Sequence, residues 1–178
     1  MASASDKDIF FDLGCGVGQL CILAAAEFHV EKAVGIESHA GRAKKAQQRV
    51  ASLGLEERIQ IIHGDVWDID LSEATIAYYG LTEWDEDLED LGKKLSPDCK
   101  LVTLFLPLVG VLPDKVDYPF YRMTLPFVRT RSLSSWIEAV LSKPASNAEL
   151  FEELDSDELY YYEKRSFKRM LRDRLDLP

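Results

Sequence analysis

Short apolar segments alternate along the first hundred residues with longer segments whose apolar positions recur at helical spacing. The apolar segments have the length and composition of buried strands: residues 8–12, 32–37, 59–63, 74–79 and 100–106. The helical spacing predicts helices over residues 18–28, 39–53 and 83–95. Strands that alternate with helices build a parallel sheet that is covered on its faces. The pattern therefore predicts an α/β fold, doubly wound around a mostly parallel sheet.

A different pattern begins after residue 106. Residues 118–123 and 127–131 have strand composition and flank Leu125-Pro126, which predicts an antiparallel hairpin around that dipeptide. Ser132 is a candidate N-cap, and the apolar spacing after it predicts a helix that continues to Leu141.

A polar break over residues 143–147 suggests a boundary between two parts of the chain. We expect one domain over residues 1–143 and a charged, helical extension over residues 144–178. Within this extension an acidic segment precedes a basic one that carries a narrow apolar stripe. Two interpretations stay open for the stripe, because it can pack on its own chain or contact a partner protein.

The first predicted strand leads into the sequence Asp12-Leu13-Gly14-Cys15-Gly16-Val17-Gly18. A glycine-rich turn between a strand and a helix is the usual ligand-binding position of an open α/β sheet. Dinucleotide loops read G-x-G-x-x-G, but Gln19 stands at the third glycine position, and no Lys-Ser/Thr pair follows as in a P-loop. We expect the backbone of this loop to approach a ligand, through the candidate residues Gly14, Cys15, Gly16 and Gly18.

Acidic residues follow three of the predicted strands. Asp12 ends the first and can hold a cationic amino group, directly or through water. Glu37 ends the second, where a carboxylate can accept hydrogen bonds from both hydroxyls of a ribose. Asp65 comes shortly after the third, in Gly64-Asp65-Val66-Trp67. Because the carboxyl ends of parallel strands share one edge of a sheet, the three acids are expected to surround one ligand.

The segment from Asp12 to Gly18 resembles motif I of the class I, seven-stranded S-adenosylmethionine-dependent methyltransferases. The segments 32–37 and 64–75 are similar to those of the small archaeal protein lysine methyltransferases and their mitochondrial relatives. This resemblance implies a Rossmann-like methyltransferase sheet and S-adenosylmethionine as the cofactor. It also implies that Asp65 accepts a hydrogen bond from the adenine amino group and that the Val66 N–H meets the ring.

The resemblance further implies protein lysine N-methylation, in which the acceptor amine must lose a proton. Tyr79, at the end of a predicted strand, and Glu83, just beyond it, are the candidate catalytic residues. Tyr79 can flank the incoming lysine and Glu83 can take up a proton or steer a basic substrate. Structural roles in the core and in a first helical turn remain open for them. So do two other functions, a small-molecule methyltransferase and a catalytically silent subunit of a larger assembly.

Composition narrows the class of binding partner and the cellular compartment that we expect. Among 178 residues, 21 are basic and 31 acidic, which gives a net charge of −10 and argues against nucleic acid while suiting a basic or lysine-bearing protein. The cysteines Cys15, Cys21 and Cys99 show neither paired nor metal-ligand spacing, so we expect no metal and a reducing compartment. The expected location is cytoplasmic, with mitochondria as an alternative, and no apolar run is long enough for a membrane span.

Overall fold

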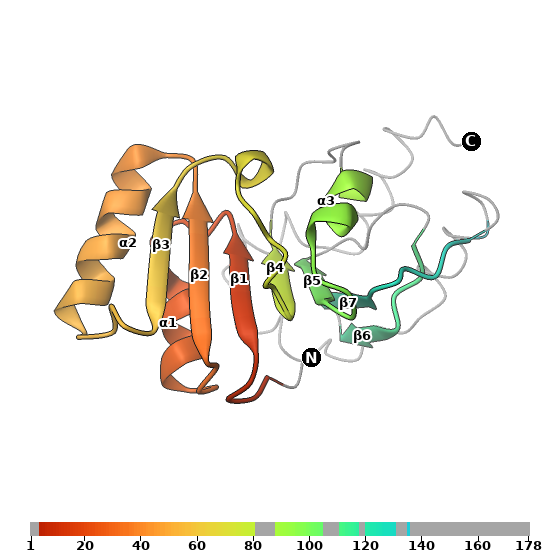
Figure 1. Cartoon of the computed structure of the whole chain (residues 1–178), viewed down its shortest axis with the longest axis horizontal. Helices are drawn as coiled ribbons and strands as arrows, with labels where there is room; N and C mark the ends of the chain where they lie inside the picture. The colour runs from red at the N-terminus through yellow and green to blue at the C-terminus, as the bar shows by residue number, and fades with distance from the viewer. Residues whose placement is uncertain (1–3, 81–87, 105–110, 118–119, 131–134, 136–178) are drawn as a thin grey trace, which may run out of the picture.

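The computed structural model describes residues 4–80, 88–104, 111–117, 120–130 and 135 (Figure 1). In chain order they form β1 (Ile9–Leu13), α1 (Gln19–Ala26), β2 (Lys32–Glu37), α2 (Ala40–Ser52), β3 (Ile59–His63), the 3₁₀ turn η1 (Val66–Asp68), β4 (Ile76–Tyr79), α3 (Leu88–Lys94), β5 (Lys100–Leu104), β6 (Lys115–Asp117) and β7 (Phe120–Thr124). Within these residues no helix is long and apolar enough to cross a bilayer.

All the strands of the described residues belong to one seven-stranded sheet with the order β3-β2-β1-β4-β5-β7-β6. The first five strands in this order are parallel, and β7 is antiparallel to both β5 and β6. The chain moves outward in one direction from β1 to β3 and in the other from β4 onward. The strand order therefore reverses between β1 and β4, which is the position where open α/β sheets bind their ligands.

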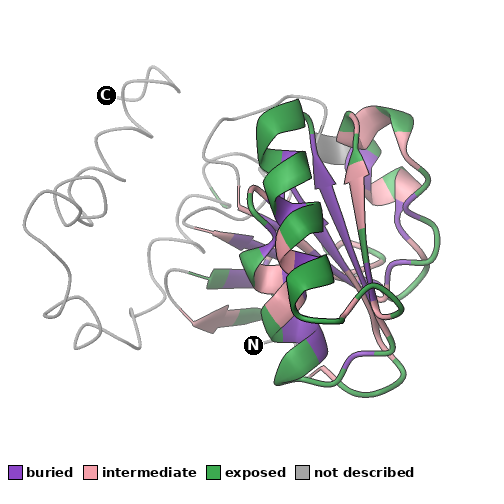
Figure 2. Ribbon diagram, turned by 90° about the vertical axis from the view of Figure 1, so that its left-hand side faces the viewer, coloured by how far each residue is buried: buried purple, intermediate pink, exposed green. Residues whose placement is uncertain are grey.

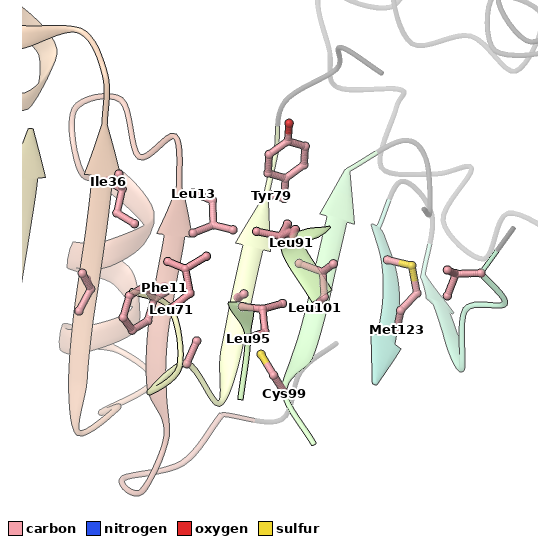
Figure 3. Packing of buried hydrophobic residues seen from close by; sticks show 14 residues of the cluster. Phe11, Leu13, Ile36, Leu71, Tyr79, Leu91, Leu95, Cys99, Leu101 and Met123 are labelled. Carbon is pink, nitrogen blue, oxygen red and sulfur yellow. The ribbon is translucent and has the colours of Figure 1, made fainter. Parts of the chain in front are cut away.

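Two hydrophobic cores cover the two faces of the sheet. On one face α1 and α2 pack against the strands through small side chains, among them Cys21, Ala25 and Val50. On the other face α3 and the segment after η1 enclose a core of larger side chains, which Figure 3 shows around Leu13, Leu91 and Leu101. Because alternate residues of a strand point to opposite faces, β1 supplies both cores. The doubly wound α/β class is thus confirmed.

Most predicted elements are present, with small shifts at their ends. The strands over residues 32–37 and 59–63 coincide with β2 and β3. The predicted helix over residues 39–53 contains α2, with His39 as its N-cap and Leu53 as its C-cap. The strand predicted over residues 8–12 lies one residue later, and β4 begins at Ile76 rather than residue 74. Residues 83–87 of the third predicted helix, most of the helix through Leu141 and the boundary at residue 143 lie outside the described residues.

The predicted hairpin is present, but different segments form it. The structure pairs β6 with β7, rather than residues 118–123 with residues 127–131. The Asp114 carboxylate accepts hydrogen bonds from Arg122 Nε at 2.6 Å and from the Thr124 N–H at 2.9 Å, which holds the start of β6 beside β7. Pro126 lacks the N–H that a ladder position needs. Phe127 instead lies against Gly92 of α3. Beyond it, Arg129 forms an isolated antiparallel bridge with Val111, and the Leu112 N–H donates to the Val128 carbonyl at 2.7 Å, so this segment lies beside the residues that precede β6.

Candidate cofactor-binding site

The glycine loop between β1 and α1 has a left-handed backbone at three positions. The φ angles are 93° at Gly14, 57° at Gly16 and 79° at Gly18, a region that favours glycine. The Gly14 and Cys15 N–H groups both donate to the Ile36 carbonyl of β2, each at 2.9 Å. A Cβ at Gly16 would meet no atom within 4 Å, so the loop faces open space at that residue. The loop is thus held from behind by β2 while its outer side is accessible.

Glu37, the last residue of β2, is only 3% exposed. Its Oε2 accepts a hydrogen bond from the Gly16 N–H at 2.9 Å, which joins the carboxylate to the glycine loop. Its Oε1 accepts from the His39 N–H and from Arg42, each at 2.8 Å. Burial alone would raise the pKa of this carboxyl, but Arg42 and the two backbone N–H groups hold the pKa below its usual range. Glu37 is therefore a rigidly placed carboxylate ion.

Asp12 lies on β1 beside α1 and is also 3% exposed. Cys21 Sγ, at 3.9 Å from Oδ2, donates the hydrogen bond found for this carboxyl among the described residues. Burial raises the pKa of Asp12 to about 7, Cys21 lowers it in part, and the charge of Glu37 raises it further. A buried carboxyl without a described basic partner is suited to a ligand that brings its own positive charge.

Asp65 and Val66 begin η1, directly after β3. The Asp65 carboxylate accepts a hydrogen bond from the Trp67 N–H at 3.0 Å and so caps this turn. The Gly64 N–H donates to the Glu37 carbonyl at 3.1 Å, which places the turn next to the end of β2. From α3, Lys94 Nζ donates to the carbonyls of Val66, at 3.3 Å, and Trp67. The turn is thus fixed at both ends.

Of the two candidate catalytic residues, the structure describes Tyr79 but not Glu83. Tyr79 is 6% exposed and belongs to the core on the α3 face, and Figure 3 shows its hydroxyl directed toward the carboxyl end of β4. Its neighbour Tyr78 lies on the opposite face, where burial and the charge of Asp12 raise its pKa to about 12. Glu83 lies outside the described residues. Tyr79 is therefore beside the candidate site, mostly enclosed by apolar side chains.

Taken together, the structure brings the glycine loop, Asp12, Glu37 and Asp65 to the carboxyl ends of β1, β2 and β3. Sequence reasoning missed the side chains that hold them, namely Cys21, Arg42, Lys94 and Arg49, whose Nη1 donates to the Val17 carbonyl of the glycine loop. The positions of Arg42 and Arg49 at one helical face were visible as a spacing of seven residues, but nothing in the pattern says what that face contacts. No group of three metal-binding side chains occurs in the part of the chain that the structure describes.

Comparison with known proteins decides the family. The model of the ANTKMT methyltransferase domain matches residues 12–115, more than half of the chain. The chain belongs to the ANTKMT methyltransferase domain family. The chain is also 36% identical to a protein-lysine N-methyltransferase of Saccharolobus islandicus (strain REY15A) over 118 residues. The aligned region covers 65% of this chain and 73% of that protein.

Solved structures agree with this family membership. An RNA methyltransferase from Salinibacter ruber, in complex with S-adenosyl-L-homocysteine, has a TM-score of 0.67 and 29% identity over 74% of this chain and 90% of that one. A geranyl diphosphate C-methyltransferase from Streptomyces coelicolor A3(2), with a TM-score of 0.50 and 22% identity over 56% of this chain and 39% of that one, shares the fold. The ANTKMT domain described here is thus an S-adenosylmethionine-dependent methyltransferase with a Rossmann-like sheet.

The residues at the sheet edge fit this cofactor. Its amino group is a cation, and Asp12 offers a buried carboxyl that lacks a described cationic partner. Its ribose carries hydroxyl donors, and Glu37 offers a fixed carboxylate beside the open side of the glycine loop.

Proposed function

We propose that this chain is a protein-lysine N-methyltransferase. The observation that carries the proposal is the similarity to the Saccharolobus islandicus protein, which extends over most of that protein's length. The net charge of −10 supports it, because an acidic protein attracts a basic, lysine-bearing acceptor. We further propose an intracellular location and, for residues 144–178, contact with a partner protein.

The cofactor roles follow from the chemistry of each group. Glu37 is proposed to accept hydrogen bonds from the ribose hydroxyls, and Asp12 to pair with the amino group. The backbone of Gly14, Cys15, Gly16 and Gly18 is proposed to line the middle of the cofactor. Asp65 and the Val66 N–H are proposed to contact the adenine. When bound, the cofactor supplies an electrophilic methyl group on a sulfonium.

The acceptor lysine must present a neutral amine, although its ordinary pKa is about 10.4. Tyr79 is proposed to line the acceptor's path at the carboxyl end of β4, since its hydroxyl is directed to this edge (Figure 3). Glu83 follows β4 by four positions and is proposed to take up the proton or to orient a basic peptide. In-line alignment of amine and methyl then supplies most of the rate enhancement.

RNA is a second candidate acceptor, favoured by the similarity to the Salinibacter ruber protein. The two acceptors separate when the chain is incubated with methyl-labelled cofactor and a cell extract that has been treated with ribonuclease or with protease. We expect label in protein, recovered as methyllysine after acid hydrolysis, and insensitive to ribonuclease. Label that enters RNA would contradict the lysine proposal, as would label found in small molecules alone. The Glu37→Gln variant, in which cofactor binding should be strongly weakened, serves as the control.

The raised pKa of Asp12 predicts a pH-dependent affinity. Below pH 7 the free protein carries a proton on Asp12, which it must release to pair with the cofactor's amino cation. The dissociation constant for S-adenosylhomocysteine should therefore fall about tenfold from pH 5 to 6, about fivefold from pH 6 to 7, and level off about one pH unit higher. Calorimetric titration across this range measures it. In Asp12→Asn the affinity should be lower and flat with pH; an equal slope in this variant would contradict the role of Asp12.

A further inference from the structure

One face of α2 contacts the cofactor site at three points. Arg42, Ala46 and Arg49 are spaced by four and three residues, so they lie on the same side of the helix. Figure 2 shows α2 exposed on its outer side and buried where it faces the sheet. Of the three residues, Ala46 is buried, Arg49 is half-buried and Arg42 is exposed. The middle contact is close packing, because a Cβ at Gly18 would come within 3.2 Å of Ala46 Cβ.

Arg42 forms an ion pair with Glu37, with 2.8 Å between Nη2 and Oε1. The arginine side chain is 56% exposed while the Glu37 side chain is 3% exposed. Arg42 therefore lies on the solvent side of the pair, and the buried Glu37 carboxylate is held by its three hydrogen bonds. The same carboxylate accepts from the Gly16 N–H through its other oxygen, so Arg42 also restrains the glycine loop indirectly.

Arg49 contacts the loop directly with two different nitrogens. Its Nη1 donates to the Val17 carbonyl at 2.8 Å, and its Nη2 donates to Gln19 Oε1, also at 2.8 Å. Val17 lies inside the glycine loop, and Gln19 is the first residue of α1. One guanidinium thus bridges the loop and the start of the helix that follows it, and the planar fork of arginine presents the two N–H donors in a fixed geometry.

We propose that Arg42 and Arg49 are positioning residues of the cofactor site. Arg42 orients the Glu37 carboxylate toward the ribose, and Arg49 holds the glycine loop in its cofactor-binding conformation. Neither needs to touch the cofactor, since each acts through a group that does. This inference rests on the proposed contacts of Glu37 and of the loop with the cofactor.

Substitution of each arginine by methionine tests the inference. Loss of these partly exposed charged hydrogen bonds should weaken binding of S-adenosylhomocysteine by about three- to tenfold per variant. Calorimetric titration measures the affinity, and turnover at saturating cofactor should be unchanged while the KM for the cofactor rises. The lysine variants separate the two roles. Arg42→Lys should restore most of the affinity because one Arg42 nitrogen makes the contact with Glu37, whereas Arg49→Lys should restore less, because lysine lacks the rigid fork that contacts Val17 and Gln19 with two nitrogens.

Arg58→Met is the matched control. Arg58 also donates to a backbone carbonyl, that of Val30 at 2.9 Å, but at the opposite end of the strands from the glycine loop. The Arg58→Met substitution should lower the thermal midpoint of the protein without changing its affinity for S-adenosylhomocysteine. Unchanged affinity in Arg42→Met and Arg49→Met, with a wild-type chain that binds, would overturn this inference alone. A folded wild-type chain that binds no S-adenosylhomocysteine would overturn the cofactor assignment as well, so the two failures are distinguishable.

Discussion

Replacing Glu37 with glutamine is expected to weaken binding of S-adenosylhomocysteine by about a hundredfold or more, because charged hydrogen bonds to both ribose hydroxyls are lost. The amide also places its single N–H₂ group against either the Gly16 N–H or the His39 N–H, which now point at different oxygens of a carboxylate. This part of the effect acts on the loop rather than on the ribose. Calorimetric titration at pH 8 measures the combined loss.

The control for Glu37→Gln is Glu31→Gln, which removes the same charge from an exposed residue just before β2. We expect this variant to bind as the wild type does. The thermal midpoints of both variants should be measured alongside, so that a loss of folded protein is not counted as a loss of affinity. Affinity within threefold of the wild type in a folded Glu37→Gln variant would contradict the ribose-binding role.

Replacing Gly35 with alanine is expected to lower the free energy of unfolding by about 1–3 kcal/mol, the usual cost of overpacking a core. A Cβ at Gly35 would lie 2.7 Å from Cys15 Sγ, 2.9 Å from Cys15 Cβ and 2.9 Å from Cys21 Sγ. Because Cys15 belongs to the glycine loop, its displacement should also weaken cofactor binding. Denaturant titration measures the stability, and calorimetry the affinity.

Gly64→Ala is the matched control for Gly35→Ala, since the nearest atom to its Cβ, Ile69 Cδ1, would lie at an ordinary 3.5 Å. Neither glycine has a left-handed backbone, so the two substitutions differ mainly in the space available. Adding Cys21→Ala to the Gly35→Ala chain should recover part of the stability, because it removes one of the three close contacts. Equal stability of the two single alanine variants would show that the sulfur atoms move aside without cost.

The sequence predicted the cofactor loop and the acids around it because each depends on local order. A strand that ends in Asp12 and turns through three glycines has few backbone solutions, and Glu37 terminates a strand whose limits the apolar run sets. The parallel arrangement then brings the strand ends to one edge. The same argument predicted Asp65 at this edge. In the structure its carboxylate caps η1 by accepting a hydrogen bond from the Trp67 N–H.

The hairpin shows where local pattern is insufficient. Residues 127–131 have the composition of a strand, but β7 already pairs with β5 and β6 on its two edges, and the described part of this segment contributes an isolated bridge between Arg129 and Val111. Which segment becomes a strand of the hairpin depends on the contacts of Asp114 and on pairing between residues far apart in the chain. These long-range contacts override the strand composition of residues 127–131. For the same reason the short, charged segment of β6 carried no clear strand signal.

By itself, the sequence determined the α/β class, the glycine loop and the order of the acids along the chain, since these follow from hydrophobic periodicity and from residues adjacent to one another. Only the tertiary structure decided the raised pKa of Asp12, the fit of Gly35 beneath Cys15 and Cys21, and the contacts of Arg42 and Arg49 with the site. These depend on burial and on distances between residues far apart in the chain. A linear pattern does not contain that information, because it says which face is apolar but not what lies opposite it.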